Sequence, residues 1–191
     1  MMNLDNPLPP ILNAFEATRD ALRVTRRLIP ELEAKQPDCQ GELFHQRRKL
    51  LNRTVFPNHP NGKVLLEQTE KEIQDLFVLN LWVVFERFVR LYLQQIKRLE
   101  KNQRHFFCEA LYQDFQKKLE FLTAQEILDF LKLSFFNTNE GSHLIGSARQ
   151  ILEYRNWVAH RNPKKRSRVR IVPNIAYDTL NEIIETLLQH S

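Results

Sequence analysis

Glycine and cysteine are scarce in this chain of 191 residues, which contains four glycines and two cysteines. Turn-rich β folds use glycine at many of their turns. The shortage of glycine, beside thirteen phenylalanines and many Leu, Glu, Gln, Lys and Arg residues, therefore favours helices. Cys39 and Cys108 lie far apart and lack the spacing of a metal or redox motif, so we interpret both as reduced thiols.

Long apolar runs are also absent. The longest, from Leu76 to Phe85, is interrupted by Asn80 and is too short to span a bilayer. The first ten residues have neither the basic flank nor the apolar centre of a signal peptide. We therefore expect a cytoplasmic protein without a membrane partner.

The six histidines form no HExxH motif and no cluster of metal ligands. His105 and Glu109 are one helical turn apart, but such a pair more often lies on a solvated helix face. The sequence predicts no metal site and no cofactor.

Apolar residues recur at helical spacing along most of the chain. We expect an all-α protein, an up-and-down helical bundle with additional helices, in one domain over residues 1–191. Its N-terminus is expected to be flexible over about 1–9, and a loop is expected over 161–172. The pattern is helical from Val64 to about Asn102, and its middle, from Phe77 to Tyr92, is apolar nearly all round, which predicts a central buried helix.

The other helices are expected at about 11–32, where Pro30 marks the end or a kink, and at about 40–52, 105–118, 123–136, 143–160 and 177–188. Residues 56–62, FPNHPNG, are expected to form a loop. Thr123 with Glu126 predicts a capping box at the start of the helix at 123–136, and Pro173 suits the start of the last helix.

Residues 155–160, RNWVAH, are the most informative segment of the chain. They continue a stripe of three- and four-residue steps formed by Ile145, Ala148, Leu152, Arg155 and Ala159. Arg155 thus occupies a position where a hydrophobic residue is expected. A guanidinium there must be paired or face a polar cavity, because burial of a lone charge is very costly.

The end of this helix decides how its charged residues meet. Pro163 disfavours helical geometry just before it, so the helix is expected to end near 160–162. Arg155 and His160 are five residues apart, which is about 140° around a helix. They converge only if His160 lies on a broken last turn or if two chains each contribute a pair. Asn156 shares a face with His160, so its amide is expected to orient the imidazole.

RNWVAH resembles the signature of the HEPN superfamily, all-α domains in which an arginine, four to six residues and a histidine form the motif. The resemblance implies a HEPN-type bundle and a metal-independent endoribonuclease acting by 2′-hydroxyl attack. It assigns catalysis to Arg155, which grips the phosphate, to His160, which moves protons, and to Asn156. It also implies RNA as substrate, a homodimer with a composite active site, and a role as a toxin of a toxin–antitoxin system or a phage-defence effector.

A cognate antitoxin or regulator is consistent with that role, but its type is not encoded in any motif. Several HEPN toxins carry a tyrosine two residues after the histidine, to which the antitoxin attaches adenylate. This chain has Asn162 at that position, which puts that mode of inhibition in doubt.

Positive charge is concentrated directly after the motif. Residues 161–170 contain six basic residues and no acid, which fits contact with RNA phosphates, although a solvated loop has the same composition. The basic residues are Arg161, Lys164, Lys165, Arg166, Arg168 and Arg170.

Glu86 is the leading candidate to support Arg155, because it is an acid within the apolar central helix. An ion pair with Arg90, four residues on, is the equally weighted alternative. For the whole protein, two further functions stay open: a non-catalytic HEPN-like module that binds RNA or a nucleotide, and a helical protein-interaction module.

Overall fold

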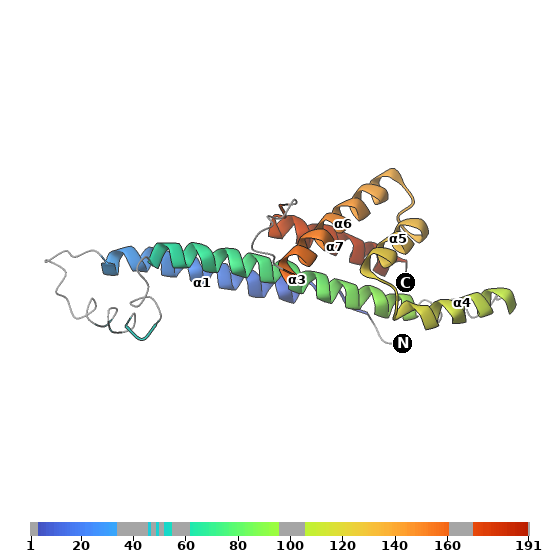
Figure 1. The fold of residues 1–191 in the computed structure, drawn as a ribbon, viewed down its shortest axis with the longest axis horizontal. Coiled ribbons are helices and arrows are strands. Elements are labelled where there is room, and N and C mark those ends of the chain that lie inside the picture. Colours follow the sequence, from blue (N-terminus) through green and yellow to red (C-terminus); the bar gives the residue numbers. More distant parts are fainter. Residues whose placement is uncertain are drawn as a thin grey trace. The chain divides into compact units, whose positions relative to one another are not determined.

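The computed structural model describes residues 4–33, 46, 49, 52–54, 62–95, 106–160 and 170–190 (Figure 1). Over these ranges the regular elements are all helices, which confirms the predicted all-α bundle. They are α1 (Pro9–Glu33), α3 (Gly62–Gln95), α4 (Phe106–Leu119), α5 (Ala124–Ser134), α6 (Asn139–Ala159) and α7 (Pro173–Gln189). The HEPN type of the bundle stays a prediction.

The chain divides into two compact units, which we describe separately. Unit 1 comprises Met1–Leu12 and Asp75–Ser191, and unit 2 comprises Asn13–Gln74. The prediction of a single domain stays a prediction. The expected flexible N-terminus is anchored from Asn6 onward, since its amide donates to Asn181 Oδ1 at 2.7 Å and to Glu185 Oε1 at 2.6 Å on α7.

Helices α3, α5, α6 and α7 supply most of the core of unit 1, and α6 packs against both α5 and α7 (Figure 1). Helix α3 supplies the largest buried side chains, Trp82 and Phe85, each 1% exposed. Burial of large apolar side chains is the main favourable contribution to folding. The smaller helices complete this core with Ile127, Leu128, Leu131, Ile145, Ala148, Ile151, Leu180, Ile183, Ile184 and Leu187.

Burial of the central helix is less complete than predicted. Leu76, Asn80, Val83, Arg87 and Leu91 are exposed, so one face of α3 is open to solvent between 76 and 91. These positions recur at three- and four-residue steps, and apolar and polar residues alternate along them. The apolar composition of the segment hid this face, because Leu76, Val83 and Leu91 look like core residues in sequence.

Helix starts follow local capping chemistry. Thr123 caps α5 in the predicted capping box with Glu126, and Pro173 begins α7 as predicted. Helix α6 begins at Asn139, four residues before the expected His143, because the Thr138 hydroxyl accepts the Gly141 N–H at 3.1 Å.

Gly141 sits at a point of close approach in the first turn of α6. A Cβ at this position would lie 2.8 Å from Cα of Phe136, so only glycine fits there without a shift of the chain. The start of α6 therefore lies close against Phe136, which follows the end of α5.

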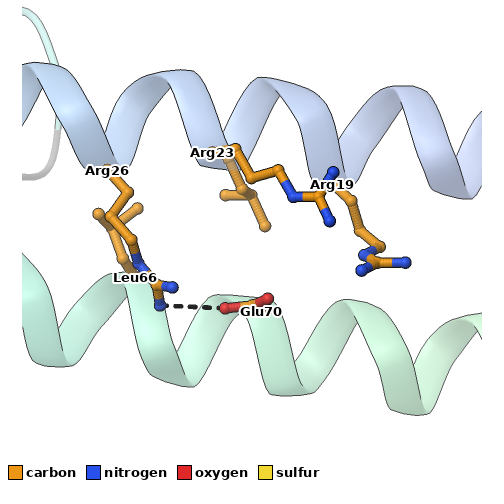
Figure 2. Close-up of a pocket in the computed structure, with 6 residues that line it drawn as sticks. Arg19, Arg23, Arg26, Leu66 and Glu70 are labelled. Atoms are coloured by element: carbon orange, nitrogen blue, oxygen red, sulfur yellow. Dashed lines mark hydrogen bonds and ion pairs between the residues drawn. The ribbon is translucent and has the colours of Figure 1, made fainter. Parts of the chain in front are cut away.

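In unit 2, α1 and α3 run side by side (Figure 2). Helix α1 continues through Pro30 to Glu33, although the proline was expected to end or kink it. The predicted second helix near 40–52 and the predicted loop at 56–62 lie almost wholly outside the described residues.

Candidate functional site

The core-facing stripe of α6 is buried up to Leu152 and then opens. Ile145, Ala148 and Leu152 are buried, whereas Arg155 is half-buried and Ala159 is exposed. The last turn of α6 therefore leaves the core. A cation at Arg155 has access to solvent, and its charge does not need a buried counterion.

The Arg155 guanidinium is bonded to a neutral group. Its Nη1 donates to Oδ1 of Asn156 at 2.9 Å. Its Nε is buried and has no hydrogen-bond partner among the described residues. Because a guanidinium carries five N–H donors, Arg155 keeps most of its donor capacity for an anion.

His160 is the C-cap of α6, so the helix ends where Pro163 predicted. The His160 backbone has φ −115° and ψ 29°, and its N–H donates to the Asn156 carbonyl at 3.1 Å. Its side chain is exposed. The imidazole is thus placed in solvent at the tip of the helix, immediately after the last helical turn.

The structure brings Arg155 and Asn156 together but does not join either side chain to the imidazole of His160. The expected orienting bond from Asn156 to His160 is absent from the part of the chain that the structure describes, because the amide oxygen accepts from Arg155 instead. Within one chain α6 is continuous from Arg155 to Ala159, so the angular separation predicted from helix geometry is retained.

The predicted basic loop is described only at its end. Arg170 is exposed and lies just before α7. The other predicted RNA-binding residues, Arg161, Lys164, Lys165, Arg166 and Arg168, lie outside the described residues.

Glu86 does not support Arg155. Its Oε1 accepts from Arg90 Nη2 at 2.7 Å and from Arg90 Nε at 3.2 Å, and its Oε2 accepts from the indole N–H of Trp82 at 3.1 Å. The open alternative of a Glu86–Arg90 helical pair is therefore the arrangement present. Its physical advantage is proximity, since residues four apart on one helix meet without any tertiary rearrangement.

Arg90 also donates hydrogen bonds to two backbone carbonyls. Its Nη1 donates to the Leu119 carbonyl at 2.7 Å, and its Nη2 donates to the Leu122 carbonyl at 2.8 Å. Leu119 is the last residue of α4, and Leu122 lies in the connection between α4 and α5. Arg90 thus ties that connection to α3 and satisfies two backbone acceptors.

Asp75 is a residue of this region that the sequence analysis missed. Its carboxylate is buried, with the residue 1% exposed, and it accepts a short hydrogen bond from the Tyr154 hydroxyl. Asp75 precedes Val78, Trp82 and Phe85 at three- and four-residue steps, so it occupies a core position of α3. The test that singled out Arg155 on α6, a charge on an apolar stripe, would have found Asp75 on α3.

The hydrogen bond to Asp75 fixes the last turns of α6 to α3. Tyr154 precedes Arg155 directly, and its ring lies 5.8 Å from that of Trp157 at an interplanar angle of 34°. In the sequence, Tyr154 and Trp157 flank Arg155, where internal packing is favoured over stacking on a base. The Tyr154 ring packs beside Trp157 and its hydroxyl is bonded, so Tyr154 acts as an anchor of the helix end.

Within the described ranges, no group of three or more His, Cys, Asp and Glu side chains is arranged to hold a metal ion. None of the helices described is both long and apolar enough to cross a membrane. Comparisons of the chain with protein-family models, curated proteins and solved structures found no match.

Proposed function

We propose that this protein is a metal-independent endoribonuclease of the HEPN type, with Arg155 and His160 as its catalytic residues. One observation carries the proposal. Arg155 is a half-buried cation at the open end of α6, bonded to the neutral side chain of Asn156, and an exposed histidine follows five residues later. A guanidinium arranged in this way is available to a phosphodiester.

The chemistry needs few groups. The 2′-hydroxyl oxygen attacks the adjacent phosphorus, its proton passes to a base, and the bond from phosphorus to the 5′ oxygen breaks as that oxygen takes up a proton. His160 supplies or accepts protons, because a neutral imidazole has one N–H donor and one acceptor nitrogen. Arg155 stabilises negative charge on the non-bridging oxygens with its fork of donors. The products are a 2′,3′-cyclic phosphate and a 5′-hydroxyl.

The role that we propose for Asn156 is based on its hydrogen bond with Arg155. Because its Oδ1 accepts from Arg155, Asn156 orients the guanidinium rather than the imidazole. Arg155 and His160 of one chain lie on different sides of α6. A homodimer would place His160 of the partner subunit beside Arg155 and so bring the two kinds of side chain together. We further propose that the protein works in the cytoplasm as a toxin or a phage-defence effector, under control of an antitoxin or regulator.

Incubation of the purified full-length protein with a defined RNA in EDTA tests the proposal. His160→Ala and Arg155→Ala should each lower the cleavage rate by about a hundredfold or more, since general acid–base and charge stabilisation each contribute at least that much. His143→Ala, an exposed histidine near the other end of α6, and Arg87→Ala, an exposed arginine on α3, are matched controls that should cleave normally. Mass spectrometry of the fragments should show the cyclic phosphate.

Retained cleavage in both site variants, with folding verified by circular dichroism, would refute the proposal. The bond between Arg155 and Asn156 favours one alternative, a non-catalytic module that grips RNA or a nucleotide without transferring a proton. In that case the RNA is recovered intact, its binding weakens with salt, and Arg155→Ala weakens binding whereas His160→Ala does not.

A further inference from the structure

An arginine row lies along α1 in unit 2. Residues 19–27 contain four arginines and one acid, Asp20. Arg19, Arg23 and Arg26 recur at steps of four and three residues, so they share one face of the helix. Figure 2 shows these three side chains between α1 and α3. They line a shallow groove together with Leu22, Leu66 and Glu70.

Each arginine of the row has a weak partner. Arg23 Nη1 lies 2.9 Å from Asp20 Oδ1, with both side chains more than 60% exposed. Arg26 Nη2 lies 3.0 Å from Glu70 Oε2 (Figure 2), and the Arg19 guanidinium lies 5.4 Å from the centre of the Phe15 ring. Exposed ion pairs contribute little because water and salt screen them. These side chains can therefore exchange a carboxylate for another anion with a small loss.

The spacing of the row suits a repeating anion. From Arg19 to Arg26 the helix rises about 10.5 Å, which is close to three times the rise of roughly 3.4 Å per nucleotide of one strand in a stacked duplex. Guanidinium groups bind phosphate oxygens through two parallel hydrogen bonds, which a row of lysines would not provide. Leu22 and Leu66, which also line the groove, have no side-chain donor or acceptor that would compete.

We infer that Arg19, Arg23 and Arg26 form a binding surface for the phosphate backbone of an RNA strand, separate from the residues of the proposed cleavage site. The recognition of phosphates rests on the side chains of unit 2. The choice of RNA as their source rests on the proposed function.

Glu70 is the internal competitor for this surface. Its carboxylate occupies Arg26 and adds negative charge at the groove (Figure 2). A strand that binds here must displace it. Glu70→Gln, which removes the charge and keeps the size of the side chain, therefore strengthens binding, whereas loss of the arginines weakens it. If the groove had only a structural role, the substitutions of Glu70 and of the arginines would not change RNA affinity in opposite directions.

The test is binding of a labelled 2′-O-methyl oligoribonucleotide to the full-length protein, measured by fluorescence anisotropy over a salt series. This probe keeps the phosphates but cannot be cut by 2′-hydroxyl attack, so the result does not depend on cleavage. The triple variant Arg19→Gln/Arg23→Gln/Arg26→Gln should bind at least about tenfold more weakly, with the salt slope reduced by about two. Glu70→Gln should bind about two- to fivefold more tightly at low salt.

Lys71→Gln is the matched control, because it removes one exposed positive charge of unit 2 outside the groove. It should change the affinity less than Arg19→Gln does. An unchanged affinity in the triple variant, or weaker binding by Glu70→Gln, overturns the inference. Competition by a polyglutamate peptide that equals competition by unlabelled RNA also overturns it, since the surface would then not distinguish RNA from an acidic peptide. If wild-type protein binds this probe but cuts no RNA, the proposed function fails and the inference stands.

Discussion

Arg90 and Arg155 are both partly buried arginines of unit 1, and they differ in what their donors meet. Arg90 donates to both Glu86 and the backbone carbonyls of Leu119 and Leu122. Arg155 donates to one neutral amide oxygen, and its Nε has no partner among the described residues. The first arginine has its charge and hydrogen bonds satisfied by the fold, and the second does not.

The difference separates two uses of a cation in a helical bundle. An arginine that neutralises a carboxylate and closes two backbone carbonyls is a structural element, since its removal exposes several groups at once. An arginine held only by the amide of its neighbour contributes little to folding and remains able to bind an anion. Substitution of Arg90 should therefore mainly lower stability, whereas the same substitution of Arg155 should mainly lower RNA cleavage.

The largest expected effect is on RNA cleavage at Arg155. Arg155→Lys keeps the charge but loses the fork of donors, so cleavage should fall by about tenfold, between wild type and Arg155→Ala. Single-turnover cleavage assays in EDTA measure the cleavage rates of wild type, Arg155→Lys and Arg155→Ala, which should fall in that order. Equal activity of Arg155→Lys and wild type would show that charge alone suffices, and the argument from two-point phosphate binding would fail.

Stability should show the reverse ranking. Arg90→Met should lower the free energy of unfolding by about 2–3 kcal/mol, because it leaves Glu86 Oε1 and the carbonyls of Leu119 and Leu122 without their donor. Arg155→Met should change it by less than about 0.5 kcal/mol, as expected for a partly exposed side chain with one hydrogen bond. Urea unfolding followed by circular dichroism measures both. Similar losses of stability in Arg90→Met and Arg155→Met would contradict the distinction between a structural arginine and one that is available to an anion.

The sequence predicted local features of the fold well. Thr123 and Glu126 were identified as a capping box because the interaction spans only three residues. The end of α6 near His160 followed from Pro163. The start of α6 was missed, because the polar residues 137–142 look like a loop when the cap at Thr138 and the close contact of Gly141 with Phe136 are not known.

The candidate site was predicted in its residues but not in its contacts. Periodicity located Arg155, yet Glu86 had two equally plausible partners and the nearer one, Arg90, is bonded to it. Asp75 carried the same signal on α3 and went unnoticed beside an apolar run. Whether His160 meets an arginine depends on loops or on a second subunit, and helix spacing within one chain carries no information about either.

A smaller effect is expected at the bond that holds the end of α6. Tyr154→Phe removes the hydroxyl that donates to buried Asp75, which should lower the free energy of unfolding by about 1–2 kcal/mol. Amide hydrogen exchange should accelerate most near residues 154–158. Asp75→Asn, which keeps an oxygen acceptor for the hydroxyl, is the matched control and should lose less. Equal protection of these amides in Tyr154→Phe and wild type would rule out the anchoring role.

The smallest effect is a pH dependence of stability at the start of α5. The Thr123 backbone N–H donates to the Glu126 carboxylate at 2.6 Å and its hydroxyl donates at 2.7 Å, and these bonds, the backbone one first, lower the pKa of Glu126. A carboxyl with a lowered pKa in the folded state stabilises the protein above its unfolded pKa, and this contribution is lost as the pH falls through the folded value. The melting temperature of the wild type should therefore fall more steeply than that of Glu126→Gln as the pH drops below the ordinary range of glutamate. Glu153→Gln, which removes another exposed carboxylate and leaves the capping box intact, should keep the wild-type slope. Parallel curves for wild type and Glu126→Gln would show that the capping box makes no contribution that depends on the charge of Glu126.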